Sequence, residues 1–148
     1  AEEGYSEPEA EDFAYPVPWL KTGPVKDRMY YASHRNLLLR AGWSTDSEKA
    51  LKTANDEFAA AQKLCPNDPR LEYAMGLALW NHGRRDEAVR WFDISARLDG
   101  GMPPFLPAAQ AAAWSRLVIG ERDAGLRQVV LTARALGQSR GDYPTQIQ

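Results

Sequence analysis

Residues 71–99 (LEYAMGLALWNHGRRDEAVRWFDISARLD) contain two amphipathic helix patterns separated by one turn glycine, Gly83. The pattern repeats, because a shift of 34 residues superposes equivalent positions: Ala54 on Ala88, Phe58 on Phe92, Leu64 on Leu98, Leu37 on Leu71 and Gly42 on Gly76. A helical hairpin of this length cannot bury its own apolar stripe, so successive copies must stack on one another. The sequence therefore predicts an all-α fold made of repeated helical hairpins, without strands.

A third, weaker copy follows an insertion around residues 100–107. In the second helix of each unit, a small residue and a large one four positions later share a face, which lets neighbouring helices approach closely beside a large side chain. The third copy keeps the spacing of Gly83, Ala88, Phe92 and Ser95 in Gly120, Gly125, Val129 and Thr132. The repeat therefore continues to the end of the second helix of this unit.

These motifs resemble the tetratricopeptide repeat, a helix-turn-helix unit of about 34 residues. The middle unit places Gly76, Leu79, Gly83, Ala88, Phe92 and Leu98 where that family has glycine, a large apolar residue, glycine, alanine, phenylalanine and leucine. Two positions depart from the pattern, since Glu72 replaces a tryptophan and Gly100 a proline. The resemblance covers about residues 28–137 and implies a right-handed superhelical stack of about three units.

We divide the chain into an amino-terminal extension (residues 1–24), one repeat domain (25–137, with units 28–68, 69–102 and 103–137) and a carboxyl-terminal tail (138–148). The first helix is expected from Val25 to Ala41, with Gly42 as its carboxyl-terminal cap. On this register, the coincidence of Gly42 with Gly76 is accidental.

The other helix ends carry local signals. Thr45 and Glu48 form a capping-box pattern for the next helix. Asp68 followed by Pro69 starts the middle unit, and Pro107 starts the third. Gly137 is expected to end the last helix, with a frayed tail beyond it.

The extension begins with twelve residues that carry six acidic groups and no basic one. This composition favours a solvated and partly disordered segment. Phe13, Tyr15 and Trp19 then lie among prolines, which favour extended geometry. One hypothesis is that Tyr15 and Trp19 cover the first helix. The other is that residues 13–20 occupy the concave groove and compete with a ligand.

Composition narrows the classes of partner and says little about location. The net charge of −2 and pI of 5.7 give no basic field for nucleic acid. No apolar run approaches the roughly 18 residues of a membrane span. The start AEEG would fit a mature exported or periplasmic protein, and an excised cytoplasmic domain would begin in the same way. Cys65 is the single cysteine and has no internal disulfide partner.

The resemblance also implies which residues line a partner groove. The family's groove positions correspond to Met29, Ala32, Asn36, Leu39, Arg70, Tyr73, Leu77, Trp80, Gln110, Trp114 and Leu117. This surface is apolar and aromatic, which suits the anchoring side chains of a peptide. For the leucines, packing between helices is an equal alternative. A clamp for acidic carboxyl-terminal tails is not expected, because Ala32, Ala74, Pro107 and Ala111 replace its polar and cationic residues and Asn36 alone fits.

No catalytic or metal-binding motif stands out. His82 is interpreted as a solvent-facing residue at a helix end, and His34 as a partly buried helix residue. Neither histidine has a second ligand at the spacing that a metal site needs. Asp86 and Glu87 open a helix, where acidic residues favour the helix dipole, and Cys65 lacks an activating neighbour. We therefore expect no enzyme activity, no cofactor and no metal.

The sequence predicts a scaffold that binds a peptide or partner protein in the concave groove. The alternative is a chaperone or regulatory subunit of a larger assembly, such as a secretion system, and an enzyme ranks third. The sequence leaves open the identity of the partner and whether the chain associates with itself.

Overall fold

The computed structural model describes residues 15–98 and 103–140, with side chains up to residue 137. These ranges are helical and contain no strand, which confirms the all-α prediction. The helices are α2 (Trp19–Thr22), α3 (Val25–Ala41), α4 (Ser47–Leu64), α5 (Pro69–Asn81), α6 (Arg85–Ala96), α7 (Leu106–Val118) and α8 (Arg122–Arg140).

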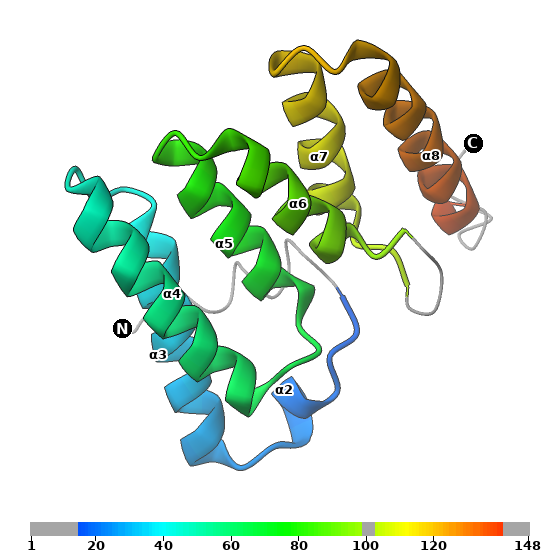
Figure 1. The fold of residues 1–148 in the computed structure, drawn as a ribbon. Helices are drawn as coiled ribbons and strands as arrows, with labels where there is room; N and C mark the ends of the chain where they lie inside the picture. Colours follow the sequence, from blue (N-terminus) through cyan, green and yellow to red (C-terminus); the bar gives the residue numbers. More distant parts are fainter. Residues whose placement is uncertain (1–14, 99–102, 141–148) are drawn as a thin grey trace.

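The six long helices form three hairpins, α3–α4, α5–α6 and α7–α8, which follow one another in a row (Figure 1). Helix α5 packs against both helices of the preceding hairpin, and α7 packs against α6. One hydrophobic core runs through the row, from Val17 and Tyr31 to Ala112. No hairpin is therefore packed only on itself.

The middle hairpin shows why its glycines and its aromatic residue occur together. Gly83 has a φ of +83°, a left-handed conformation that strongly favours glycine. At Gly76, an added Cβ would lie 2.5 Å from Cε1 of Phe92. Phe92 is 2% exposed and Ala88 is fully buried. The glycine on α5 and the ring on α6 therefore set the distance between these two helices.

Two of the predicted helix starts are confirmed and one is corrected. Asp68 caps α5, accepting a hydrogen bond from the Arg70 backbone amide, and Pro69 is the first residue of the helix. Pro107 lies in the first turn of α7. Helix α4 is capped by Asp46, not by Thr45, because the Asp46 carboxylate accepts a hydrogen bond from the backbone amide of Lys49 at 3.2 Å.

The predicted helix ends are right in one case and wrong in the other. Helix α3 ends at Ala41 as expected, although Gly42 follows in a right-handed conformation (φ −65°, ψ −18°) and not in a left-handed cap. Gly137 does not end α8, which continues to Arg140. A glycine inside a helix costs about 1 kcal/mol, which the helix-forming residues before it, such as Ala133 and Leu136, can offset.

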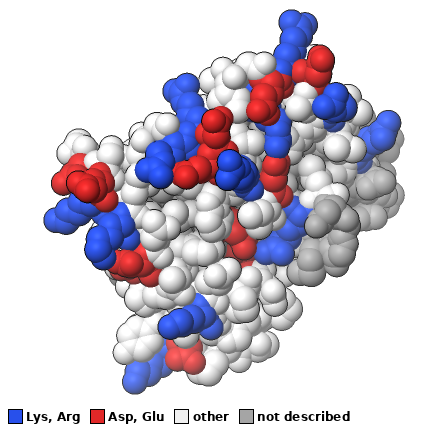
Figure 2. All heavy atoms as spheres, in the orientation of Figure 1, with Lys and Arg blue, Asp and Glu red and all other residues white. Residues whose placement is uncertain are grey.

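We find no membrane-spanning candidate among the helices of residues 15–98 and 103–140, since none is both long and apolar enough. On the face shown in Figure 2, basic and acidic side chains are interspersed, and neither sign forms a large patch of its own.

Candidate functional site

The residues predicted to line a groove come from α3, α5 and α7 and differ in exposure. Arg70 is buried, whereas Gln110 and Trp114 are exposed, Trp114 by 68%. Met29 is also exposed, by 67%. The remaining residues are half-buried: Ala32, Asn36, Leu39, Tyr73, Leu77, Trp80 and Leu117. Trp114 is therefore the large predicted side chain with the most surface left for a partner.

Two predicted aromatic residues on α5 already have intramolecular contacts. The Tyr73 ring packs against the rings of Phe92 and Phe105, with centroids 5.8 and 5.9 Å apart. The Trp80 ring lies under the guanidinium of Arg85, 4.7 Å from its centroid. These two residues therefore contribute to packing as well as to any partner surface.

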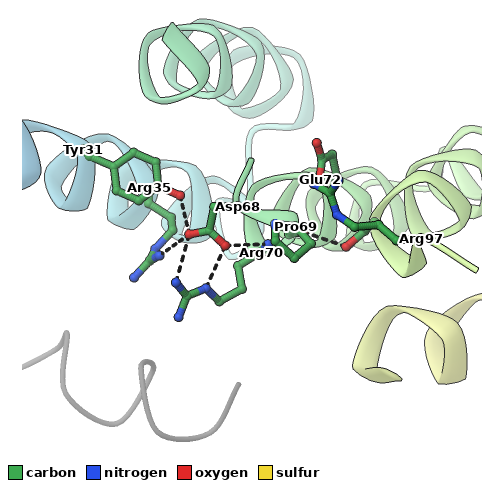
Figure 3. Close-up of polar contacts among 8 residues, drawn as sticks. Tyr31, Arg35, Asp68, Pro69, Arg70, Glu72 and Arg97 are labelled. Atoms are coloured by element: carbon green, nitrogen blue, oxygen red, sulfur yellow. Dashed lines mark hydrogen bonds and ion pairs between the residues drawn. The ribbon is translucent and has the colours of Figure 1, made fainter. Parts of the chain in front are cut away.

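Arg70 belongs to a buried ionic cluster at the start of α5 (Figure 3). The Asp68 carboxylate, which is fully buried, accepts a 2.5 Å hydrogen bond from the Tyr31 hydroxyl and a 2.9 Å bond from Arg35. The Arg70 guanidinium donates two further bonds to it, at 2.9 and 3.0 Å. Asp68 therefore links the start of α5 to α3. Arg70 binds this carboxylate and presents little surface to a partner.

The pKa shifts agree with an ionised carboxylate in this cluster. Burial by itself would raise the pKa of Asp68, but the hydrogen bonds and charge of Arg70, together with the charge of Arg35, lower it. Burial and the negative charge of Asp68 raise the pKa of Tyr31, which stays protonated and donates its hydrogen bond.

Glu72, at the position where the tetratricopeptide pattern has a tryptophan, is also buried. Burial raises its pKa, against the opposing effect of the Arg97 guanidinium, which lies 3.5 Å from it. A charged pair thus occupies the position where the repeat pattern has a large ring.

The amino-terminal strip, residues 15–23, contacts both the first hairpin and the segment that precedes α7. Trp19 packs edge-on against Tyr31 of α3 at 5.8 Å, as the covering hypothesis predicts. Tyr15 contacts the segment before α7: its hydroxyl donates a 2.7 Å hydrogen bond to the Pro103 carbonyl, and its ring contacts Phe105. The strip therefore covers more than the first helix. Phe13 lies outside the described residues.

The α7–α8 hairpin carries an open apolar pocket of about 290 Å³. Its lining consists of Gln110, Ala113, Trp114, Leu117, Val129, Thr132, Ala133 and Leu136. The structure thus brings together the three groove residues predicted in the third unit, and adds a wall from α8 that the sequence analysis missed.

Helix α8 turns small and polar residues inward and large apolar residues outward. Its buried residues are Gly125, Gln128 and Thr132. Its large apolar side chains are 39–50% exposed, namely Leu126, Val129, Val130, Leu131 and Leu136. We call these five exposed side chains together the α8 apolar face.

A polar network attaches α8 to the rest of the row. The Arg116 guanidinium of α7 binds Asp93 of α6, at 2.8 Å for one of its hydrogen bonds, and also Gln128 of α8. Gln128 in turn donates to Asp93 at 3.1 Å. Gly125 completes the contact, because an added Cβ would lie 2.8 Å from Cδ2 of Leu117. Polar and small residues therefore make the closest contacts of α8 with α6 and α7.

A second, polar pocket of about 340 Å³ lies between α4, α5 and α6. Two of its cations are exposed and paired locally, Lys52 with Asp56 and Arg84 with Glu87. The pocket has no deeply buried polar group that would select a ligand.

His82 is not solvent-facing, which corrects the sequence interpretation. Its Nε2 donates a 2.9 Å hydrogen bond to the Ala41 carbonyl, and its Nδ1 lies 2.8 Å from the Ser47 hydroxyl. It therefore links the second hairpin to the turn of the first. His34 is partly buried as predicted and pairs with Glu57 at 2.6 Å.

In the part of the chain that the structure describes, no three histidine, cysteine, aspartate or glutamate residues gather as metal ligands. Cys65 is buried, and burial raises the pKa of its thiol. The chain has no significant match to a family model, to a curated protein or to a solved structure.

Proposed function

We propose that this chain is a protein-interaction scaffold of the tetratricopeptide type, with three units, and that it holds a partner on the α7–α8 surface. The observation that carries the proposal is the pocket beside Trp114, which this exposed tryptophan lines together with two outward apolar residues of α8, Val129 and Leu136. Exposed apolar patches of this kind mark interaction sites in soluble proteins.

The packing of the row suggests the shape of the partner segment. Helix α5 lies against both helices of the first hairpin. Within the described residues, no helix lies in the same way against α7 and α8. A helix from a partner, with apolar residues along one face, fits this position. The half-buried residues Asn36, Leu39, Leu77 and Trp80 extend the proposed surface along the row.

The test compares two exposed tryptophans. Trp114→Glu places a charge in the pocket, and Trp43→Glu is the matched control, because Trp43 is 82% exposed in the turn between α3 and α4. Tryptophans at the centre of an interface contribute about 2 kcal/mol or more, which corresponds to roughly 30-fold in affinity.

Affinity capture from the native host with quantitative mass spectrometry should show partners that are lost with Trp114→Glu and retained with Trp43→Glu. Circular dichroism should show equal helical content for all three proteins. If both variants capture the same partners as the wild type, the α7–α8 surface is not the binding site.

A further inference from the structure

We propose that the α7–α8 surface pairs with the same surface of a second copy of this chain, with the two α8 helices antiparallel. This inference rests on the proposed function, since it names the partner of that surface. Three properties of the hairpin support it: the amount of exposed apolar area, the order of charges along α8, and the symmetry that self-pairing requires.

The exposed apolar area is sufficient for a stable dimer. Six large apolar side chains of the hairpin are between 39% and 68% exposed: Trp114, Val118, Leu126, Val129, Val130 and Leu136. Half-exposed side chains of these sizes present on the order of 500 Å² of apolar surface, toward the upper end for the largest patch of a monomer. A standard interface buries about 800 Å² per partner, of which somewhat more than half is apolar. The hairpin supplies that fraction when the partner copy covers both the Leu126 and Val130 face of α8 and the pocket beside Trp114.

Two opposite charges of α8, Asp123 and Arg134, fit an antiparallel pair. Asp123, Leu126, Val130 and Arg134 follow one another at intervals of three, four and four residues, so they share one face of the helix. This face lies opposite the buried residues Gly125, Gln128 and Thr132. In an antiparallel pair, Asp123 of each copy lies opposite Arg134 of the other, and Leu126 and Val130 of both copies lie between the two ion pairs.

Two-fold symmetry makes both contacts occur twice, because an isologous interface uses the same residues from each copy. A parallel arrangement would instead place Asp123 beside Asp123. Helix α3 also exposes apolar residues, Met29 and Tyr30 among them. Packing of α3 on α7–α8 would be heterologous and open-ended, and would give polymers. The antiparallel pair therefore predicts a closed dimer.

The experiment is sedimentation equilibrium of the full chain at micromolar concentration and low ionic strength. We expect a dimer for the wild type. Val130→Glu should give a monomer, and Ile94→Glu should not, because Ile94 is a comparably exposed residue on α6 (56%). Circular dichroism of both variants checks that the fold is kept.

A charge exchange tests the antiparallel register. Asp123→Arg and Arg134→Asp each place like charges opposite one another at both ends of the pair, so each variant alone should dimerise about 10-fold or more weakly than the wild type. An equimolar mixture of the two variants should regain dimers, because every substituted side chain then faces an opposite charge. High salt should reduce both effects.

A wild-type monomer, an open-ended polymer, a dimer that survives Val130→Glu, or a mixture that stays as weak as its components would each overturn this inference. A monomer whose captured partners still depend on Trp114 would leave the proposed function standing. A dimer that Val130→Glu dissociates, combined with unchanged capture by Trp114→Glu, would show that proteins other than a second copy bind elsewhere on the chain, and would refute the proposed function only for those proteins.

Discussion

Replacing Asp68 with asparagine should strongly destabilise the protein, because it removes the negative charge from a fully buried ionic cluster. Asp68 accepts hydrogen bonds from Tyr31, Arg35 and Arg70, and both arginines are only 6% exposed. Asparagine caps a helix about as well as aspartate, so Asp68→Asn keeps the start of α5. The variant leaves the buried guanidinium groups of Arg35 and Arg70 without a negatively charged partner.

The expected loss is about 3–5 kcal/mol, the usual effect of removing one partner from a buried ion pair. For a urea m-value of about 2 kcal/mol per molar, this corresponds to a fall of about 1.5–2.5 M in the unfolding midpoint. Asp46→Asn is the matched control, since Asp46 caps α4 through the Lys49 amide but is exposed. It should change the unfolding free energy by only a few tenths of a kcal/mol.

Urea unfolding at pH 7, followed by circular dichroism at 222 nm, measures both variants. The pH dependence gives a second readout. The pKa of Asp68 is lower in the folded protein than its ordinary value of 3.8, so its stabilising effect is complete above that value and is lost as the pH falls through the folded pKa. The difference between wild type and Asp68→Asn should shrink over this acidic range. Equal midpoints for Asp68→Asn and Asp46→Asn would refute the argument.

Two further predictions concern the α5–α6 contact. Phe92→Ala should lower the unfolding free energy by about 3–5 kcal/mol, because the ring is 2% exposed between the helices; chemical denaturation measures it, and a loss below 1 kcal/mol would contradict the assigned register. Gly76→Ala should destabilise by about 1–3 kcal/mol, since its Cβ would lie 2.5 Å from that ring. The control Gly137→Ala should instead stabilise by up to about 1 kcal/mol, because it lies within α8 and its Cβ would meet nothing within 4 Å. Equal thermal midpoints for these two glycine variants would count against close packing at Gly76.

Local chemistry explains which parts of the fold could be predicted from the sequence. Asp68 followed by Pro69 is a complete start signal within two residues, and the structure has α5 beginning there. The burial of Ala88 and Phe92 also follows from spacing along a single helix. Gly137 misled the prediction because a glycine marks a helix end only when the chain adopts a left-handed turn, and here α8 continues through it.

The cluster around Asp68 could not be predicted, because its members are far apart in the sequence. Tyr31 and Arg35 lie on α3, more than 30 residues before the carboxylate that they contact. The sequence analysis assigned Arg70 to the groove because of its position in the repeat pattern. That position does not indicate that the Asp68 carboxylate, two residues earlier, binds the Arg70 guanidinium. For this reason the sequence identified Trp114 as exposed but assigned Arg70 to a surface from which it is largely excluded.

The orientation of α8 depends on a contact between three helices. Large apolar residues occur around most of this helix, so hydrophobic periodicity alone does not fix which side faces inward. The Arg116 network with Asp93 and Gln128, and the close approach at Gly125, turn the small and polar side of α8 toward α6 and α7. As a result α8 lacks, within one chain, part of the hydrophobic stabilisation that full burial of its large apolar residues would give. A partner that covers its apolar face would add that stabilisation, so binding there and the stability of the last hairpin are thermodynamically coupled.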